Sequence, residues 1–99
     1  MERGGVTYIM TNYNNTVLYT GVTSDIISRV MEHKTKADPY SFTAKYNVNK
    51  LVYFQVFSSI EEAIDKEKYI KGKSRKWKMD LISKDNPEWK DLWEEIKEW

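Results

Sequence analysis

The chain has 99 residues and no cysteine, and its 16 Lys/Arg against 15 Asp/Glu leave a formal net charge of +1. This length predicts one domain with a modest core, and the lack of cysteine excludes disulfides and thiolate metal sites. No apolar run approaches the roughly 18 residues of a membrane span, and the first residues lack a signal-peptide core, so we expect a cytoplasmic domain with no membrane contact.

The charges are distributed unevenly along the chain. Residues 1–84 carry 14 Lys/Arg against 9 Asp/Glu, a net +5, whereas residues 85–99 carry 2 against 6, a net −4. We therefore expect the body of the chain, and not its last residues, to face an anionic partner.

A β-hairpin is predicted first, over "VTYIMTNYNNTVLYTG". β-branched and aromatic residues flank the "NYNN" cluster, and asparagine tolerates the left-handed conformations that a hairpin turn requires. The two strands should cover about 6–12 and 16–21.

An amphipathic helix is predicted next, over "SDIISRVMEHK", with Ser24 or Asp25 as its N-cap. Its apolar stripe has helical spacing and consists of Ile26, Ile27, Val30 and Met31. Residues 35–49 show no period and contain Pro39, so we expect a long loop with room for one helical turn. The segment "KLVYFQVF" that follows is a third strand, and its nearly continuous apolar character favours a central place in the sheet.

Three helices are predicted in the last 40 residues. Ser59 and Glu62 form a capping box for the first, which ends near Gly72, and Ser74 caps the second. The third should run over about 86–98, with Asn86 as cap, Pro87 at the first helical position and one apolar face. That face consists of Trp89, Leu92, Trp93, Ile96 and Trp99.

These elements predict an α+β domain, a small three-stranded antiparallel sheet flanked by helices in the order β-β-α-β-α-α-α. The core of the domain should span about 5–83. The acidic Trp-bearing helix would follow it.

Glu67 stands on the apolar face of the predicted helix that begins after Ser59. Burial of a carboxylate costs several kcal/mol unless the group is paired or bound to a metal. Glu67 therefore needs a partner. The simpler alternative is that it lies at the edge of the face and pairs with Lys71, one turn further on.

Arg29 and His33 lie beside the apolar stripe of the first helix. Alternatively, Arg29 pairs with Asp25 at i,i+4, and His33 stabilises the helix C-terminus as a cation. Tyr8 and Tyr19 lie on the two strands of the hairpin, where ordinary packing would also explain them.

The stretch "KEKYIKGKSRKWK", residues 66–78, carries seven basic residues, one acidic residue and two aromatic residues. This composition suits contacts to phosphate and stacking on bases. A solvated helix face would explain the same charge density.

Together, these residues resemble the GIY-YIG nuclease superfamily, whose two motifs lie on its first two strands. The second motif is "YTG" at 19–21, and the first is represented by "VTY" at 6–8, where Val and Thr replace the usual Gly-Ile. Arg29 stands ten residues after Tyr19, as does the catalytic arginine of the family. The segment "AIDKEKYIK" resembles the one that carries the family's metal-binding glutamate, here Glu67.

The resemblance is strongest to small stand-alone bacterial members related to the catalytic domain of the excision-repair endonuclease, and it covers about 5–83. It implies an endonuclease that hydrolyses phosphodiester bonds with one divalent ion, Mg²⁺ or alternatively Mn²⁺. The implied partner is nucleic acid, DNA rather than RNA, cut in a structure- or strand-dependent manner in repair or nucleic-acid processing. No partner protein is implied, and we expect a monomer or a weak oligomer.

The resemblance also implies roles for individual residues. Catalytic roles fall to Tyr8, Tyr19, Arg29, His33 and Glu67. Gly21 is structural at the site and would let the chain turn from Tyr19 towards Arg29 and His33. Glu67 would hold the metal and Arg29 the phosphate, whereas Tyr8 would activate water with a pKa lowered by a neighbouring cation. Basic residues that would carry the nucleic-acid backbone are Lys34, Lys36, Lys45, Lys66, Lys68, Lys71, Lys73, Arg75, Lys76 and Lys78.

Two other functions fit the sequence. A domain of this fold could bind nucleic acid without cutting it, because a fold does not guarantee an activity. The Trp-bearing C-terminal helix could instead be a protein-interaction surface, although tryptophans on one helix face are more often part of a core.

Overall fold

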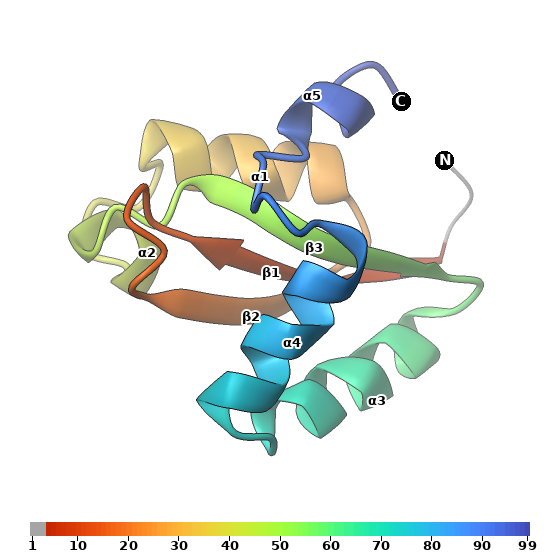
Figure 1. Cartoon of the computed structure of the whole chain (residues 1–99). Coiled ribbons are helices and arrows are strands. Elements are labelled where there is room, and N and C mark those ends of the chain that lie inside the picture. Colours follow the sequence, from red (N-terminus) through yellow and green to blue (C-terminus); the bar gives the residue numbers. More distant parts are fainter. Residues whose placement is uncertain (1–3) are drawn as a thin grey trace.

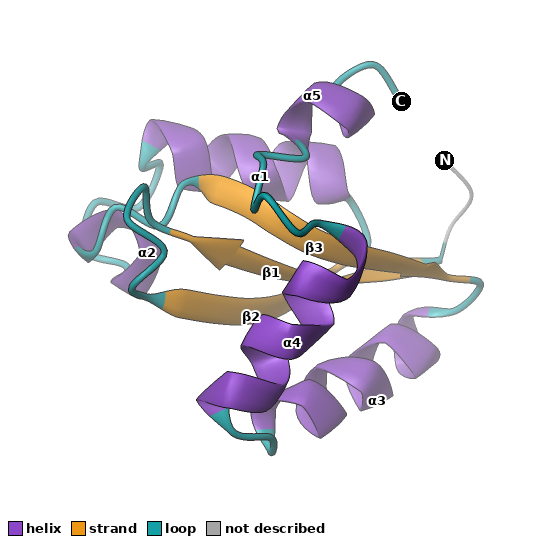
Figure 2. Ribbon diagram, in the orientation of Figure 1, coloured by secondary structure: helices purple, strands orange, loops and turns teal. Residues whose placement is uncertain are grey.

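A computed structural model describes residues 4–99 and shows a three-stranded antiparallel sheet with helices on both faces (Figures 1 and 2). The strands are β1 (Gly5–Thr11), β2 (Leu18–Thr23) and β3 (Lys50–Phe57), in the spatial order β2-β1-β3. The predicted α+β class is confirmed. Among the described residues, no helix combines the length and the apolar character needed to cross a membrane.

The predicted central position of β3 is wrong, because β1 is the central strand and β3 lies at an edge. The first half of β3 is covered on both faces, with Leu51 in one core cluster and Val52 in the other. Its second half is open, and Gln55 and Val56 are exposed. The continuous apolar run thus reflects two covered faces and not two neighbouring strands.

The β1–β2 hairpin forms as predicted, with Tyr8 opposite Gly21 in the register. Asn15 adopts the left-handed conformation, with φ of 58°. The second strand begins at Leu18, two residues later than predicted, because the Asn12 side-chain oxygen accepts hydrogen bonds from the backbone N–H of Thr16 and Val17. These N–H groups therefore bond to a side chain and not to the neighbouring strand.

The first helix, α1 (Ile26–Thr35), is capped by Asp25, whose side chain accepts a hydrogen bond from the Ser28 backbone N–H. Its buried residues are Ile26, Val30 and His33. Met31, expected in the apolar stripe, is exposed. The buried stripe of α1 therefore ends on a histidine.

The long loop contains the predicted single helical turn, α2 (Phe42–Lys45), capped by Ser41. After β3 in the chain come α3 (Ile60–Lys71) and α4 (Arg75–Asp85), which are capped by Ser59 and Ser74. All three caps are serines that accept a hydrogen bond from a backbone N–H inside the first turn.

The sheet separates two core clusters. Side chains alternate along β1, so that Tyr8 faces α1, while Thr7 faces α3 and donates a buried 2.7 Å hydrogen bond to the Ala63 carbonyl. A methyl group on Gly5 would lie 2.7 Å from the Ala63 side chain, so glycine permits the close approach of α3 to the sheet. Figure 1 shows α1 on one side of the sheet and α3 on the other.

The predicted C-terminal helix over 86–98 is wrong. Asn86 ends α4 and is not an N-cap, Trp89 has φ of 54°, and only α5 (Trp93–Ile96) is helical. The extended part of this segment bonds to β3, because the Leu51 backbone N–H donates to the Asp91 carboxylate and the Leu51 carbonyl accepts from Leu92.

The apolar residues of this segment are divided between the two cores. Trp89 packs against the cluster beneath α4, whereas Leu92, Trp93 and Ile96 join the cluster beneath α1. Their spacing suggested one helix face, but the chain passes from one face of the sheet to the other. Ile96 is buried, Trp89, Leu92 and Trp93 are partly buried, and Trp99 is exposed, so the five residues do not form the single helix face considered above.

Candidate active site

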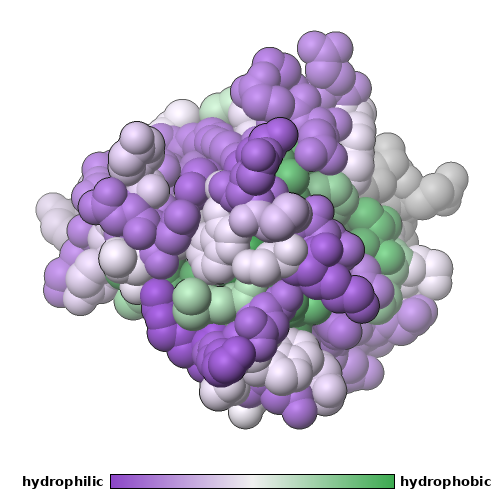
Figure 3. Space-filling view, in the orientation of Figure 1, coloured by the Kyte–Doolittle hydropathy of each residue, from purple (hydrophilic) through white to green (hydrophobic). Residues whose placement is uncertain are grey.

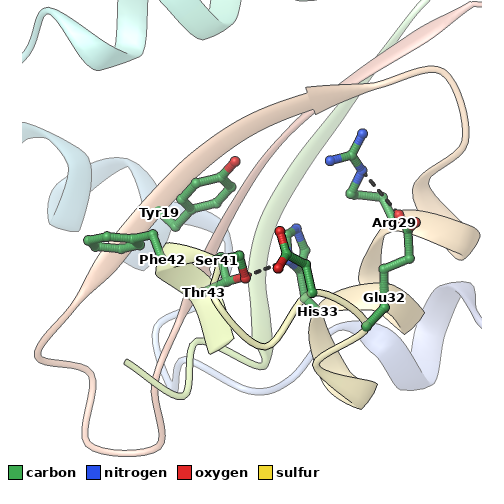
Figure 4. A pocket seen from close by; sticks show the side chains of 9 residues that line it. Tyr19, Arg29, Glu32, His33, Ser41, Phe42 and Thr43 are labelled. Carbon is green, nitrogen blue, oxygen red and sulfur yellow. Dashed lines mark hydrogen bonds and ion pairs between the residues drawn. The ribbon is translucent and has the colours of Figure 1, made fainter. Parts of the chain in front are cut away.

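A pocket of about 360 Å³ opens beside α1, between the start of β2 and the long loop. Figure 4 shows Tyr19 and Phe42 on one side of it and Arg29 with Glu32 on the other. The residues that line it are Tyr19, Arg29, Glu32, His33, Ala37, Asp38, Ser41, Phe42 and Thr43. Three of the residues predicted for the site, Tyr19, Arg29 and His33, therefore meet in one cavity.

A chain of side-chain hydrogen bonds runs behind this pocket. The Tyr8 hydroxyl lies 3.0 Å from His33 Nε2, and His33 Nδ1 lies 3.0 Å from the Thr43 hydroxyl. The Thr43 hydroxyl lies 3.2 Å from that of Ser41. Tyr8, His33 and Thr43 are all buried. The histidine of α1 thus connects the central strand with the long loop.

Burial determines the protonation of Tyr8. It raises the pKa of the phenol above its ordinary value of 10.0, and the neighbouring Tyr19 adds to this effect. Arg29 lowers the pKa of Tyr8, but burial outweighs it. Arg29 alone therefore does not produce the predicted lowering of the Tyr8 pKa, because desolvation of a buried phenolate costs more than the charge of the guanidinium offsets. Lowering of this pKa by a bound metal ion stays a prediction.

His33 is neutral for a related reason. Burial lowers the pKa of its imidazole below 6.5, and the positive charge of Arg29 lowers it further. The alternative in which His33 caps the helix C-terminus as a cation is wrong, because its ring nitrogens bond to the hydroxyls of Tyr8 and Thr43 and not to the last helix carbonyls, and its lowered pKa disfavours the cation. Both hydroxyls can donate or accept, so the bonds alone fit either tautomer. We assign the one in which Tyr8 donates to Nε2 and Nδ1–H donates to Thr43, because a neutral phenol is a stronger hydrogen-bond donor than an alcohol.

Tyr19 connects the buried pair to the open pocket. Its ring centroid lies 6.3 Å from that of Tyr8, 5.5 Å from that of His33 and 6.1 Å from that of Phe42. The two tyrosines of the hairpin therefore pack against each other, as the alternative of ordinary strand packing predicted. They do so around the histidine of α1.

Gly21 provides space and not a turn. It lies within β2, which continues to Thr23, and a Cβ at this position would come within 2.5 Å of Cζ and of the hydroxyl oxygen of Tyr8. The expectation that Gly21 turns the chain towards Arg29 is thus wrong. Any side chain at position 21 would collide with the end of the Tyr8 ring.

Arg29 is 44% exposed and forms an ion pair with Glu32, with Nε 3.4 Å from Oε1. The alternative pairing with Asp25 is wrong, because the Asp25 carboxylate bonds to the backbone and side chain of Ser28. An exposed pair of this kind contributes little stability, so the guanidinium can exchange partners at low cost.

Glu67 lies away from this pocket. It is on α3, which packs on the sheet face opposite to α1, and it does not line the cavity. Its side chain is only 14% exposed and pairs with Lys71 at 2.9 Å, as the simpler alternative predicted. The charge of Glu67 nonetheless reaches Tyr8, whose pKa it raises.

The donor set offers a metal ion little from the protein. Among residues 4–99, no group of three or more His, Asp or Glu side chains could hold an ion. A single carboxylate such as Glu67 fits a hard ion that keeps several waters and takes further oxygens from phosphate. Lys71 is half exposed and can leave Glu67 without being desolvated.

Several of the predicted nucleic-acid contacts are engaged within the fold. Lys34 is the most constrained of them, because its ammonium is held by the Asn49 carbonyl and the Asp91 carboxylate. Arg75 donates to the Thr16 carbonyl at 2.8 Å. Lys73 lies 4.4 Å from the centroid of the Tyr69 ring. Lys34 thus connects α1 to the C-terminal segment, and contact of these three residues with phosphate stays a prediction.

Four other predicted basic residues each contact a single neighbouring side chain. Lys36 bonds to the Asn47 side chain, Lys76 pairs with Asp80, and Lys45 and Lys66 lie over the rings of Tyr46 and Tyr69. These lysines remain predictions as phosphate contacts, as do Lys68 and Lys78. In Figure 3 the visible face is mainly hydrophilic, which agrees with this density of charge.

Sequence reasoning missed the pocket residues that the long loop and α1 contribute. Thr43 and Ser41 carry the hydrogen-bond chain, Phe42 forms an aromatic wall, and Glu32 holds Arg29. The loop lacks periodicity, so only its length indicated that it could be functional.

Comparison with known proteins agrees with this geometry. The GIY-YIG catalytic domain model matches residues 4–80. A UPF0213 protein of Clostridium perfringens is 38% identical over 66 residues, which are 67% of this chain and 70% of that protein. A UPF0213 protein of Syntrophus aciditrophicus is 37% identical over 71 residues, 72% of this chain and 80% of the other.

The solution NMR structure of a UPF0213 protein from Bacillus halodurans has a similar fold. It superimposes with a TM-score of 0.56 and 27% identity, covering 89% of this chain and 92% of that one. The match of the domain model over most of the chain, the relatives and the shared fold lead to one conclusion. The chain belongs to the GIY-YIG family, whose domains are generally nucleases.

Proposed function

We propose that the protein is an endonuclease that hydrolyses phosphodiester bonds, with DNA as its substrate. The observation that carries this proposal is the hydrogen bond between Tyr8 and His33 directly behind a pocket that contains Arg29. This arrangement combines a pair of groups that can transfer a proton with a group that can bind phosphate, in a domain that belongs to the GIY-YIG family.

Arg29 would bind the scissile phosphate. Its guanidinium matches two phosphate oxygens at once and stabilises the charge that develops on them. Glu32 now occupies that guanidinium from one side, at 3.4 Å. A phosphate would displace it, because Glu32 is exposed and loses little when it returns to water.

Proton transfer would use Tyr8 and His33 together. A free phenolate is disfavoured at Tyr8, because burial raises its pKa. We infer that the Tyr8 oxygen accepts a proton from the attacking water while its own proton passes to Nε2 of the neutral His33. No isolated phenolate forms in such a relay, and Tyr19 would orient the water or the phosphate from the pocket side.

Glu67 would hold a divalent ion, with Mg²⁺ favoured and Mn²⁺ as the alternative. When bound, such an ion supplies positive charge to the phosphate and to the leaving oxygen. Glu67 would first release Lys71, and the lysine would then be free to contact the nucleic-acid backbone.

We further propose that cutting depends on the structure or strand state of the substrate and that it serves repair or nucleic-acid processing. The competing function is a domain that binds nucleic acid without cutting it. The presence of Tyr8, Arg29, His33 and Glu67 together favours the enzyme, since a binding domain needs no neutral histidine bonded to a buried tyrosine.

The test uses branched, duplex and single-stranded DNA, incubated with the purified chain and with Mg²⁺ or Mn²⁺. We expect cleavage that is abolished by EDTA and by Glu67→Gln, while Glu61→Gln, an exposed carboxylate on the same helix, cuts normally. Binding of these DNAs without cleavage under any condition would overturn the enzyme and support the binding domain. Equal cleavage by Glu67→Gln would remove Glu67 from the site.

A further inference from the structure

Aromatic rings form a continuous row from the candidate active site to the surface. The Phe42 ring stacks on Tyr19, with an angle of 29° between the planes, and the Phe42 and Tyr46 centroids are 4.8 Å apart. Phe42 lines the pocket that holds Arg29. Figure 4 shows Phe42 beside Tyr19, on the side of the pocket opposite to Arg29.

This row is open to solvent at its outer end. Phe42 is 47% exposed and Tyr46 is 43% exposed, although each of them contacts another aromatic ring. A single exposed aromatic side chain needs no explanation. The two half-exposed rings are in contact, with an angle of 49° between their planes. They present open aromatic faces at the mouth of a pocket with an arginine, where a ligand would lie.

The surroundings of the two rings select the class of ligand. Arg29 offers a fork for a phosphate, and Lys45 places its ammonium 5.4 Å from the Tyr46 centroid. Flat rings next to cationic groups match a nucleotide, whose base stacks on an aromatic face while its phosphate meets the charge. A purely apolar partner would make no use of this guanidinium, which can exchange Glu32 for a phosphate at low cost.

We propose that Phe42 and Tyr46 form a stacking platform for one unpaired nucleobase next to the phosphate bound by Arg29. A base inside a duplex already has neighbours on both faces, so only a single-stranded or locally unpaired nucleotide can use the platform. The inference rests on the proposed function, because it takes the phosphate site to be at Arg29, and it defines the substrate class as nucleic acid with an unpaired nucleotide.

Binding can be tested separately from cutting. The fluorescence anisotropy of a labelled single-stranded oligodeoxynucleotide is measured in EDTA with wild type, Phe42→Leu and Phe42→Trp. We expect Phe42→Leu to weaken binding about tenfold or more, in line with the loss of one stacked base, and Phe42→Trp to bind as tightly as wild type. Phe42 is half exposed, so Phe42→Leu should fold, which circular dichroism verifies.

Tyr40 provides the matched control. It lies in the same loop, is 94% exposed and does not line the pocket. Tyr40→Leu should therefore bind the oligodeoxynucleotide like wild type. An equal loss in Tyr40→Leu and Phe42→Leu would show a general contribution of loop aromatics and would overturn the platform at Phe42.

A second measurement locates the base. Oligodeoxynucleotides with an abasic site at successive positions should show one position at which wild type loses affinity and Phe42→Leu loses no more. The platform would be overturned if Phe42→Leu bound as tightly as wild type, or if wild type bound a matched duplex with equal affinity. It would also be overturned if the losses of affinity from Phe42→Leu and from the abasic site were additive at every position. Because these measurements contain no metal, they stand whether or not the protein cuts DNA, and the cleavage assay tests that separately.

Discussion

The hydroxyl oxygen of Tyr8 lies 3.0 Å from Nε2 of His33, and both side chains are buried. This bond joins the central strand to the face of α1 that points into the domain. Both groups are neutral, because burial raises the pKa of the Tyr8 phenol and lowers the pKa of the His33 imidazole. A neutral donor next to a neutral base is prepared for transfer of one proton.

Tyr8→Phe should remove this transfer with little change in shape. The substitution leaves His33 Nε2 without its donor, so we expect a loss of about 1–3 kcal/mol in the free energy of unfolding and loss of DNA cleavage. Urea unfolding and the cleavage assay provide the two measurements. Tyr53→Phe is the control, since its hydroxyl bonds to exposed Gln55, where water can replace it, and cleavage should persist. Normal cleavage by Tyr8→Phe would contradict the relay.

Thr43→Val should change the tautomer of His33. The isosteric valine cannot accept the Nδ1 proton, so the buried donor would lose its partner and the Nε2–H tautomer would gain population. Nitrogen-15 NMR of the imidazole distinguishes the two tautomers. Thr43→Ser keeps the hydroxyl and should restore the wild-type spectrum and the cleavage rate. Identical spectra for wild type and Thr43→Val would refute the positioning role of Thr43.

Stability should depend on pH at both ends of the range. His33 has a lowered folded pKa, so its contribution is complete above the unfolded value of about 6.5 and is lost as the pH falls towards the folded value. Tyr8 has a raised folded pKa, so its contribution is complete below about 10 and is lost as the pH rises from there. Urea unfolding of wild type and Tyr8→Phe across pH 5–11 (about the range of these two groups) should show a weaker alkaline loss in the variant.

Gly21→Ala should destabilise the fold, although alanine is normally the better residue in a strand. Its methyl group would lie 2.5 Å from the end of the Tyr8 ring, and overpacking of this kind costs about 1–3 kcal/mol. Thermal unfolding measures the loss, and cleavage should fall because Tyr8 is displaced from His33. At Gly72 the nearest atom would be 3.6 Å away, so Gly72→Ala should keep or slightly raise stability. A neutral Gly21→Ala would argue against this account of the glycine.

Local interactions made much of the fold predictable. The serine caps of α3 and α4, the asparagine turn and the helical spacing after Asp25 each involve residues within four positions of one another, and each formed as expected. The family motifs likewise identified Tyr19, Arg29 and His33, which the pocket brings together. Short-range patterns can be predicted from the sequence because the interacting residues are close together in the chain.

Tertiary structure decided the remainder. The spacing of apolar residues at the C-terminus suggested one helix, but Asp91 bonds to Leu51, 40 residues away, and the segment follows β3 instead. The Tyr8 pKa rises because residues distant in sequence bury the ring, and Thr43 reaches His33 only through the folding of a loop without periodicity.

The sequence by itself therefore determined every element except the C-terminal one, and it named Tyr19, Arg29 and His33, which share one pocket, as candidates. Only the tertiary structure decided the protonation of Tyr8 and His33, the ion pair of Lys34 with Asp91 and the place of Glu67, which does not line the pocket but lies near enough to Tyr8 to raise its pKa. The physical reason is that desolvation and ion pairing depend on which distant groups exclude water from a side chain, and no local pattern contains that information.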